Sequence, residues 1–89
     1  MKHKFKPDWA TRPADHIREY LAERGWKQAD LARASGLSAK NVSDIMSGGR
    51  LTARSALALE KAFGLKAHIW LGIQANWDLH EARKTEHGQ

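Results

Sequence analysis

Apolar residues recur three or four positions apart in five segments of this chain, the spacing that places them on one face of a helix. Glycines, capping residues and one early proline punctuate the segments, as they do at the ends of short helices. The predicted helices cover about residues 13–24, 53–63 and 67–83, with two shorter ones between residues 28 and 48. The pattern therefore predicts an all-α fold of five helices.

The two short helices carry the most distinctive pattern in the chain. Small and apolar residues fall on the sides that we expect to face each other: Leu31, Ala32, Ser35, Val42, Ile45 and Met46. Between the helices, Gly36 can adopt the left-handed conformation that ends a helix, and Ser38 can cap the amides of the next one. Because Ala32 lets the two backbones approach closely, the chain is predicted to turn within three residues.

This close crossing with a three-residue turn predicts a helix-turn-helix. The second helix then carries short or flexible polar side chains on its outer side: Ala39, Lys40, Ser43, Asp44 and Ser47. Such side chains suit a helix that lies in a DNA major groove and touches base edges. The alternative is an ordinary pair of helices whose polar face is merely solvated.

In the DNA-binding interpretation, the exposed start of the second helix reads bases. We expect base contacts from Ala39, Lys40, Ser43 and Asp44. Lys40 can donate to guanine, Asp44 can accept from cytosine N4, and Ala39 can meet a thymine methyl group.

The flanks of the motif are expected to hold the sugar-phosphate backbone. The candidates for phosphate contacts are Gln28, Ser38, Asn41, Ser47, Arg50 and Arg54. Gln28 opens a helix whose free amides could share a phosphate, although it would be equally unremarkable as a surface glutamine. A phosphate partner would explain Arg54 better than helix stability does, since a cation in the first turn opposes the helix dipole.

The charge of the chain is unevenly distributed. Its net charge is +5, and residues 1–54 hold eleven Lys and Arg against six Asp and Glu, whereas residues 55–89 hold four of each. The whole excess lies in the half that contains the helix-turn-helix, as expected of a surface that neutralises phosphates. A small surplus of this kind can also be without function.

Composition argues against other classes of protein. No apolar run approaches the roughly 20 residues of a membrane span, and the N-terminus lacks the apolar stretch of a secretory signal, so we expect a cytoplasmic protein. Cysteine is absent, which excludes disulfides and thiolate metal sites. The histidines never occur at the i, i+4 spacing of helical metal ligands: His3, His16, His68, His80 and His87. We therefore expect no metal, no cofactor and no enzymatic activity.

The 89 residues are too few for more than one domain, and we divide them into three parts. Residues 1–12 are predicted to form a basic arm, which could follow a DNA backbone or simply be a disordered terminus. Residues 13–84 are the predicted DNA-binding domain. The polar residues 85–89 are predicted to be a frayed tail.

The last predicted helix carries more apolar surface than a small core needs. Trp70, Ile73 and Trp77 share one face, and two tryptophans alone bury roughly 300 to 500 Å². We therefore predict that these three residues form a homodimer interface. Gly72 in the helix interior suggests that another helix passes close to it, from the same chain or from a second copy.

Two flanking motifs add a family resemblance to this interpretation. The segment Pro13-Ala14-Asp15-His16-Ile17 is similar to the Pro-Gly-Glu-x-Leu entry to the first helix of the HigA antitoxins, small members of the Xre and Cro/C1-type helix-turn-helix class. The segment 70–79, WLGIQANWDL, resembles their Trp-Leu-x-Leu-Gln-x-x-Tyr-Asp-Leu signature. The likeness covers roughly residues 13–82. It departs at Ala14, where glycine is usual, at Trp77, where tyrosine is usual, and at Lys27, where a capping serine or threonine is frequent.

The resemblance implies a five-helix, lambda-repressor-like bundle that acts as a homodimer on a palindromic operator in double-stranded DNA. It further implies that the protein represses its own operon and neutralises a HigB-like toxin that cleaves mRNA. One alternative is an Xre-type regulator, similar to a phage repressor, with no toxin partner. Another is a helical adaptor that binds protein rather than DNA, which would lack the strong salt dependence of DNA binding.

Overall fold

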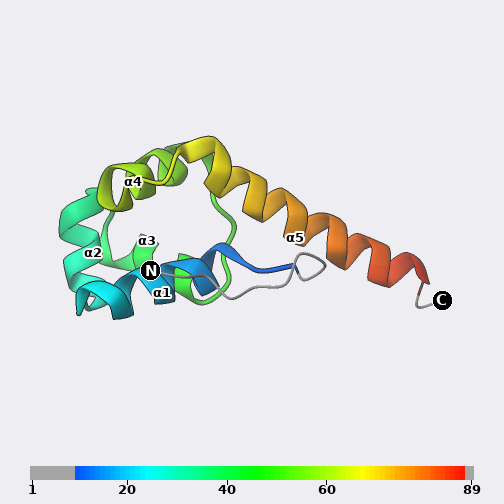
Figure 1. Ribbon diagram of the computed structural model, residues 1–89, viewed down its shortest axis with the longest axis horizontal. Helices are drawn as coiled ribbons and strands as arrows, with labels where there is room; N and C mark the ends of the chain where they lie inside the picture. The colour runs from blue at the N-terminus through cyan, green and yellow to red at the C-terminus, as the bar shows by residue number, and fades with distance from the viewer. Residues whose placement is uncertain (1–9, 88–89) are drawn as a thin grey trace.

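The computed structural model describes residues 10–87, and within this range every regular element is a helix. The five helices are α1 (Pro13–Arg24), α2 (Gln28–Ser35), α3 (Ala39–Met46), α4 (Ala53–Phe63) and α5 (Ala67–His87). Helices α1 to α4 gather into one body, and the C-terminal part of α5 extends away from it (Figure 1). The predicted all-α fold with five helices is confirmed.

The first two helices begin without a side-chain oxygen at the capping position. Arg12 and Lys27 occupy these positions, and neither side chain accepts a hydrogen bond from the helix. A carboxylate three residues later compensates: Asp15 accepts from the Arg12 backbone N–H at 3.0 Å, and Asp30 accepts from that of Lys27 at 2.8 Å. The negative charge also lies favourably at the helix N-terminus. The start of α2, where Lys27 takes the place of the frequent capping serine or threonine, thus has half of a capping box.

The core lies where α1, α2, α3 and α4 meet the first half of α5. Its largest fully buried side chains are Trp70, Ile17, Leu31, Leu59 and Val42. The Tyr20 ring stacks on the Phe63 ring with centroids 4.6 Å apart, and Trp70 lies about 6 Å from both rings. Aromatic rings supply much buried area in a small protein, so this cluster anchors α5 to α1 and α4.

Trp70 is therefore wrong as a member of a dimer interface, because its own chain buries it completely. Ile73 and Trp77 are partly buried and remain predictions. The inference from Gly72 also fails within residues 10–87, since a Cβ built on it would meet no described atom of another element within 4 Å. A helix of a second copy of the chain is the remaining candidate for a close approach to Gly72.

Helix α5 is longer than predicted. Its start is capped by Glu60 of α4, whose Oε1 accepts from the Ala67 backbone N–H at 2.8 Å. Its end lies at His87 rather than near Arg83, so residues 85–87 are helical and not a frayed tail. Local contacts accompany the extension: the Thr85 hydroxyl donates to the Glu81 carbonyl, and Lys84 pairs with the Glu81 carboxylate.

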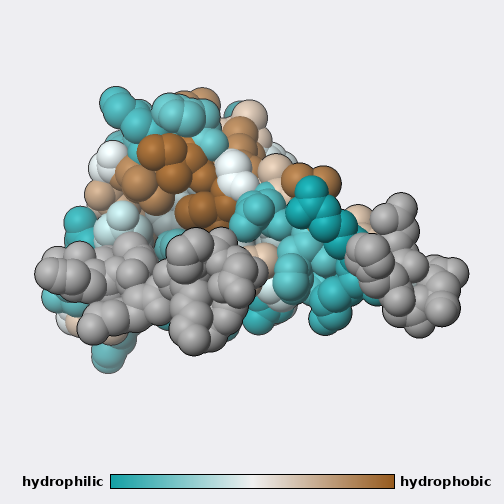
Figure 2. Space-filling view, turned by 45° about the vertical axis from the view of Figure 1, so that its right-hand side comes forward, coloured by the Kyte–Doolittle hydropathy of each residue, from teal (hydrophilic) through white to brown (hydrophobic). Residues whose placement is uncertain are grey.

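The described surface carries few large apolar side chains. Leu57, Ile69 and Leu79 are the exposed ones, and in the face shown in Figure 2 hydrophobic residues gather over the body while hydrophilic ones prevail toward the end of α5. No helix in residues 10–87 is both long enough and apolar enough to span a membrane. Most of the predicted basic arm, residues 1–9, lies outside the described residues.

Candidate nucleic-acid interface

The turn between α2 and α3 has the geometry that the sequence predicts. Gly36 has φ +82°, a conformation that favours glycine, and its N–H donates to the Ala32 carbonyl at 2.9 Å. The Leu37 N–H donates to the Ser35 hydroxyl at 3.1 Å. The Ser38 hydroxyl accepts from the Asn41 N–H at 3.0 Å, which makes Ser38 the cap of α3. These bonds hold the two helices in one fixed orientation.

Helix α3 is divided sharply between an inner and an outer side. Val42 and Ile45 are 1% and 6% exposed and face the core. The four predicted base-reading residues are all exposed: Ala39, Lys40, Ser43 and Asp44. Their common placement on the outer side of the second helix is the arrangement that major-groove recognition requires.

Two of the predicted base readers contact each other. The Lys40 ammonium lies 3.2 Å from the Asp44 carboxylate, one helical turn away, and the two side chains are 82% and 60% exposed. An exposed pair at this spacing contributes only about 0.3 to 0.5 kcal/mol. A base edge can therefore displace either partner at little cost.

The residues predicted to hold phosphates are also exposed, without exception: Gln28, Ser38, Asn41, Ser47, Arg50 and Arg54. Asn41, Arg50 and Arg54 line one groove of about 220 Å³ between α3 and the start of α4. Two hydroxyls are already engaged within the motif, since Ser38 caps α3 and Ser47 donates to the Ser43 carbonyl at 2.6 Å. Three of the six residues thus lie together, and Gln28 lies apart at the start of α2.

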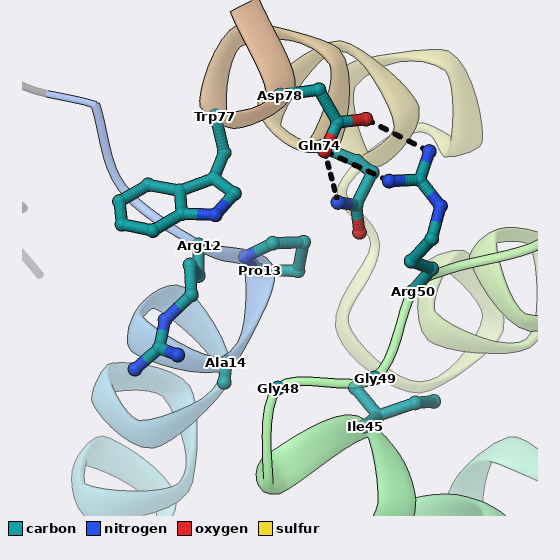
Figure 3. A pocket seen from close by; sticks show the side chains of 10 residues that line it. All are labelled: Arg12, Pro13, Ala14, Ile45, Gly48, Gly49, Arg50, Gln74, Trp77 and Asp78. Atoms are coloured by element: carbon teal, nitrogen blue, oxygen red, sulfur yellow. Dashed lines mark hydrogen bonds and ion pairs between the residues drawn. The ribbon is translucent and has the colours of Figure 1, made fainter. Parts of the chain in front are cut away.

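Arg50 has a partner that the sequence interpretation missed. Its two terminal nitrogens each lie 2.8 Å from a carboxylate oxygen of Asp78 on α5 (Figure 3). This hydrogen-bonded pairing lowers the pKa of the Asp78 carboxyl below its ordinary value. Gln74, one turn earlier on α5, donates from Nε2 to the same carboxylate at 3.2 Å. The sequence signal for this contact is slight, since Gln74 and Asp78 are simply two polar residues at i, i+4 spacing on α5.

The same junction contains a small pocket. It has a volume of about 150 Å³ and lies between the start of α1, the loop of residues 47–52 and α5 (Figure 3). The Arg12 guanidinium lies 5.6 Å from the centre of the Trp77 ring, a cation–π contact across the pocket. Trp77, which we predicted in a dimer interface, is thus already in contact with Arg12, the residue just before α1.

The far end of α3 is held by α1. The Arg18 guanidinium donates to the Met46 carbonyl at 3.3 Å, in the last turn of α3, and also pairs with Asp15 at 3.2 Å. A cation is favourable at this end of a helix because the dipole is negative there. Arg18 therefore orients α3, although it was not among the residues selected from the sequence.

Comparisons with known proteins agree with this geometry. A family model described as helix-turn-helix matches residues 17–70. The chain is 35% identical over 75 residues to the uncharacterized HTH-type transcriptional regulator YddM of Escherichia coli K12. The matched region covers 83% of this chain and 80% of YddM.

Solved structures are similar over nearly the whole chain. The structure of PA4674 of Pseudomonas aeruginosa in complex with its operator DNA has a TM-score of 0.81 at 30% identity and covers 91% of each chain. The antitoxin HigA of Pseudomonas aeruginosa, solved with the higBA promoter, has a TM-score of 0.77 at 32% identity and covers 90% of this chain and 88% of that one.

Proposed function

The chain belongs to the helix-turn-helix family of DNA-binding regulators, of the Xre or Cro/C1 type, and we propose that it represses its own operon as the antitoxin of a type II toxin-antitoxin pair. The family is one of regulators and not of enzymes. In this proposal the protein reads an operator near its own gene and binds a HigB-like toxin that cleaves mRNA.

The observation that carries the DNA-reading role is the outer side of α3. Its inner residues Val42 and Ile45 are buried, which leaves Ala39, Lys40 and Ser43 exposed on the helix that follows the turn. A helix held in this way can enter a major groove with its first two turns. The groove lined by Arg50 and Arg54 lies beside it and supplies cations for a phosphate.

A paired operator follows from the size of the motif. One helix-turn-helix reads a short half-site, and two-fold dimers read two such half-sites about one helical turn apart. The homodimer is therefore part of the proposal. Its candidate contacts are the half-exposed Ile73 and Trp77 predicted above, together with the exposed Ile69 and Leu79 on the same helix. Sedimentation should give about twice the chain mass of 10.0 kDa. A strict monomer with and without DNA would contradict this part.

Toxin neutralisation is supported by similarity to the HigA antitoxin of Pseudomonas aeruginosa across 90% of this chain. The competing proposal is a regulator without a toxin, and the likeness to the regulator YddM favours it to the same extent. The two differ in whether the product of a neighbouring reading frame binds this chain.

A gel-shift experiment with the DNA upstream of the gene tests both parts. We expect a specific shift with the protein alone and an altered shift when the product of the neighbouring reading frame is added. If that product neither binds nor is toxic when expressed alone, the regulator without a toxin is correct. If no DNA within the operon is preferred over random duplex at any salt concentration, the repressor role itself is wrong.

A further inference from the structure

We propose that Asp78 and Gln74 of α5 are positioning residues for DNA binding, which hold Arg50 and the loop of residues 47–52 in the conformation that meets a phosphate. The inference rests on the proposed DNA-binding function and adds to it a helix that lies outside the helix-turn-helix. It follows from three contacts between the loop and its neighbours.

The first contact fixes the guanidinium of Arg50. Asp78 accepts from both of its terminal nitrogens at 2.8 Å, so the planar fork of the arginine is matched by the two carboxylate oxygens. Within the described part of the chain, the Nε–H edge has no partner, and the side chain is 68% exposed. Arg50 can therefore bridge Asp78 and a DNA phosphate, with one edge for each.

The second contact fixes the backbone next to Arg50. Gln74 is only 7% exposed, and its side-chain carbonyl accepts from the Leu51 N–H at 3.1 Å while its amide donates to Asp78. Both ends of this buried amide are thus satisfied by the loop and by the residue that holds Arg50. Because an unpaired buried polar group is unfavourable, the three groups are expected to move together or not at all.

The third contact joins the loop to α3. The Gly49 N–H donates to the Asp44 carbonyl at 2.8 Å, and a Cβ on Gly49 would lie 2.8 Å from the same oxygen. The loop is therefore tied to α3 on one side and to α5 on the other. Arg50 stands between these anchors with its position set before DNA arrives, which reduces the side-chain entropy lost on binding.

Asp78 also places a negative charge near the proposed phosphate path. The proposal therefore predicts the direction in which DNA affinity changes when this charge is removed. If Asp78 acted only through its charge, its removal would strengthen DNA binding, since one repulsion would disappear. If Asp78 positions Arg50, its removal weakens binding although the protein becomes more positive. The direction of the change separates the two roles.

The experiment measures affinity for the operator and for random duplex by fluorescence anisotropy. We expect Asp78→Asn to weaken binding to both DNAs by roughly threefold to tenfold, the size expected when one long side chain must be ordered on binding. Asp78→Glu should restore part of the loss because it can pair with Arg50 again. Arg50→Lys should reproduce the loss with the charge unchanged, since an ammonium cannot form the fork.

Double variants distinguish positioning of Arg50 from a general effect of Asp78 on the fold, which would lower DNA affinity whether or not Arg50 is present. In an Arg50→Ala background, Asp78→Asn should not weaken binding further, because the guanidinium that it positions is gone. In an Arg54→Ala background, the two losses should add, since Arg54 lines the same groove without touching Asp78. The matched control is Glu81→Gln, which removes one carboxylate from the same helix away from the loop and should leave affinity the same or slightly higher.

Stronger or unchanged binding by Asp78→Asn would overturn the inference, as would full additivity with Arg50→Ala. Folding is checked by circular dichroism, and Arg50→Lys keeps the test valid if Asp78→Asn unfolds. Failure of the proposed function looks different, because the wild-type protein would then show no preference for any operon DNA.

Discussion

Helices α3 and α5 both contribute to the candidate DNA interface, but their polar residues have different partners. On α3, Lys40 pairs with Asp44 of the same helix, and both side chains are largely exposed. On α5, Asp78 pairs with Arg50, which lies 28 residues earlier in the chain, and Gln74 beside it is buried. A local exposed pair can open without disturbing the fold, whereas the second pair joins two elements. The outer side of α3 is therefore free to adapt to DNA, and α5 holds the loop beside it.

The largest effect is expected when α5 loses Trp70, its anchor in the core. Trp70→Ala should lower the free energy of unfolding by about 3 to 5 kcal/mol, since it empties a fully buried site in contact with Tyr20 and Phe63. Urea unfolding measures this loss. Trp70→Phe should lose less, because it keeps a ring and removes an indole N–H that has no partner in the described part of the chain.

The matched control for this prediction lies further along the same helix. Leu79 is 50% exposed, so Leu79→Ala should change the free energy of unfolding by less than about 0.5 kcal/mol. Equal losses from Trp70→Ala and Leu79→Ala would mean that the burial of α5 is not as described.

On α3, the expected effect concerns specificity and not stability. Lys40→Ala should weaken binding to the operator by roughly 1 to 3 kcal/mol and relax the preference at one base pair per half-site. The stability of this variant should hardly change, since Lys40 is 82% exposed and its exposed pairing with Asp44 contributes little. Selection of preferred sites from random DNA checks the prediction, and identical preferences of the variant and the wild type would show that Lys40 does not read a base.

A smaller effect is expected at Gly72, on the outer face of α5, and it tests whether this face is as accessible to solvent as the outer face of α3. Gly72→Ala should raise the free energy of unfolding by about 0.5 to 1 kcal/mol, because alanine favours the helix and its Cβ would meet no other element among the described residues. Thermal unfolding at low protein concentration measures the gain. If the variant instead weakens self-association at higher concentration, a second copy packs on this face.

The smallest effect is expected in the acid stability of the pair between α5 and the loop. The pKa of Asp78 is lowered in the folded protein by its hydrogen bonds from Arg50, so folding favours the ionised carboxylate. The stabilisation is then fully present above the pKa of the unfolded chain, about pH 4, and is lost as the pH falls through the lower folded value. The difference in stability between wild type and Asp78→Asn should be constant near neutral pH and shrink below about pH 4. A difference that grows on acidification would contradict this linkage.

The candidate interface was predictable where it depends on neighbours in the chain. The turn at Gly36, the Ser38 cap and the exposed set on α3 each follow from residues within about one helical turn. Their assignment to bases or phosphates stays a prediction. Arg18, Gln74 and Asp78 escaped notice because each acts on a residue at least 23 positions away. Side-chain type alone does not reveal such a partner.

The sequence by itself determined the five helices, the residues at which they begin and the sides of α2 and α3 that face the core, because helical periodicity and capping act over three or four residues. It also determined the family, through the turn and the segments that flank it. Only the tertiary structure decided which apolar residues of α5 are buried in the core and which remain available for an interface. Periodicity placed Trp70, Ile73 and Trp77 on one face, yet the core encloses Trp70 and the Arg12 guanidinium lies over the ring of Trp77. Burial depends on the space that four other helices leave, and that space is a property of the whole fold and not of any one segment.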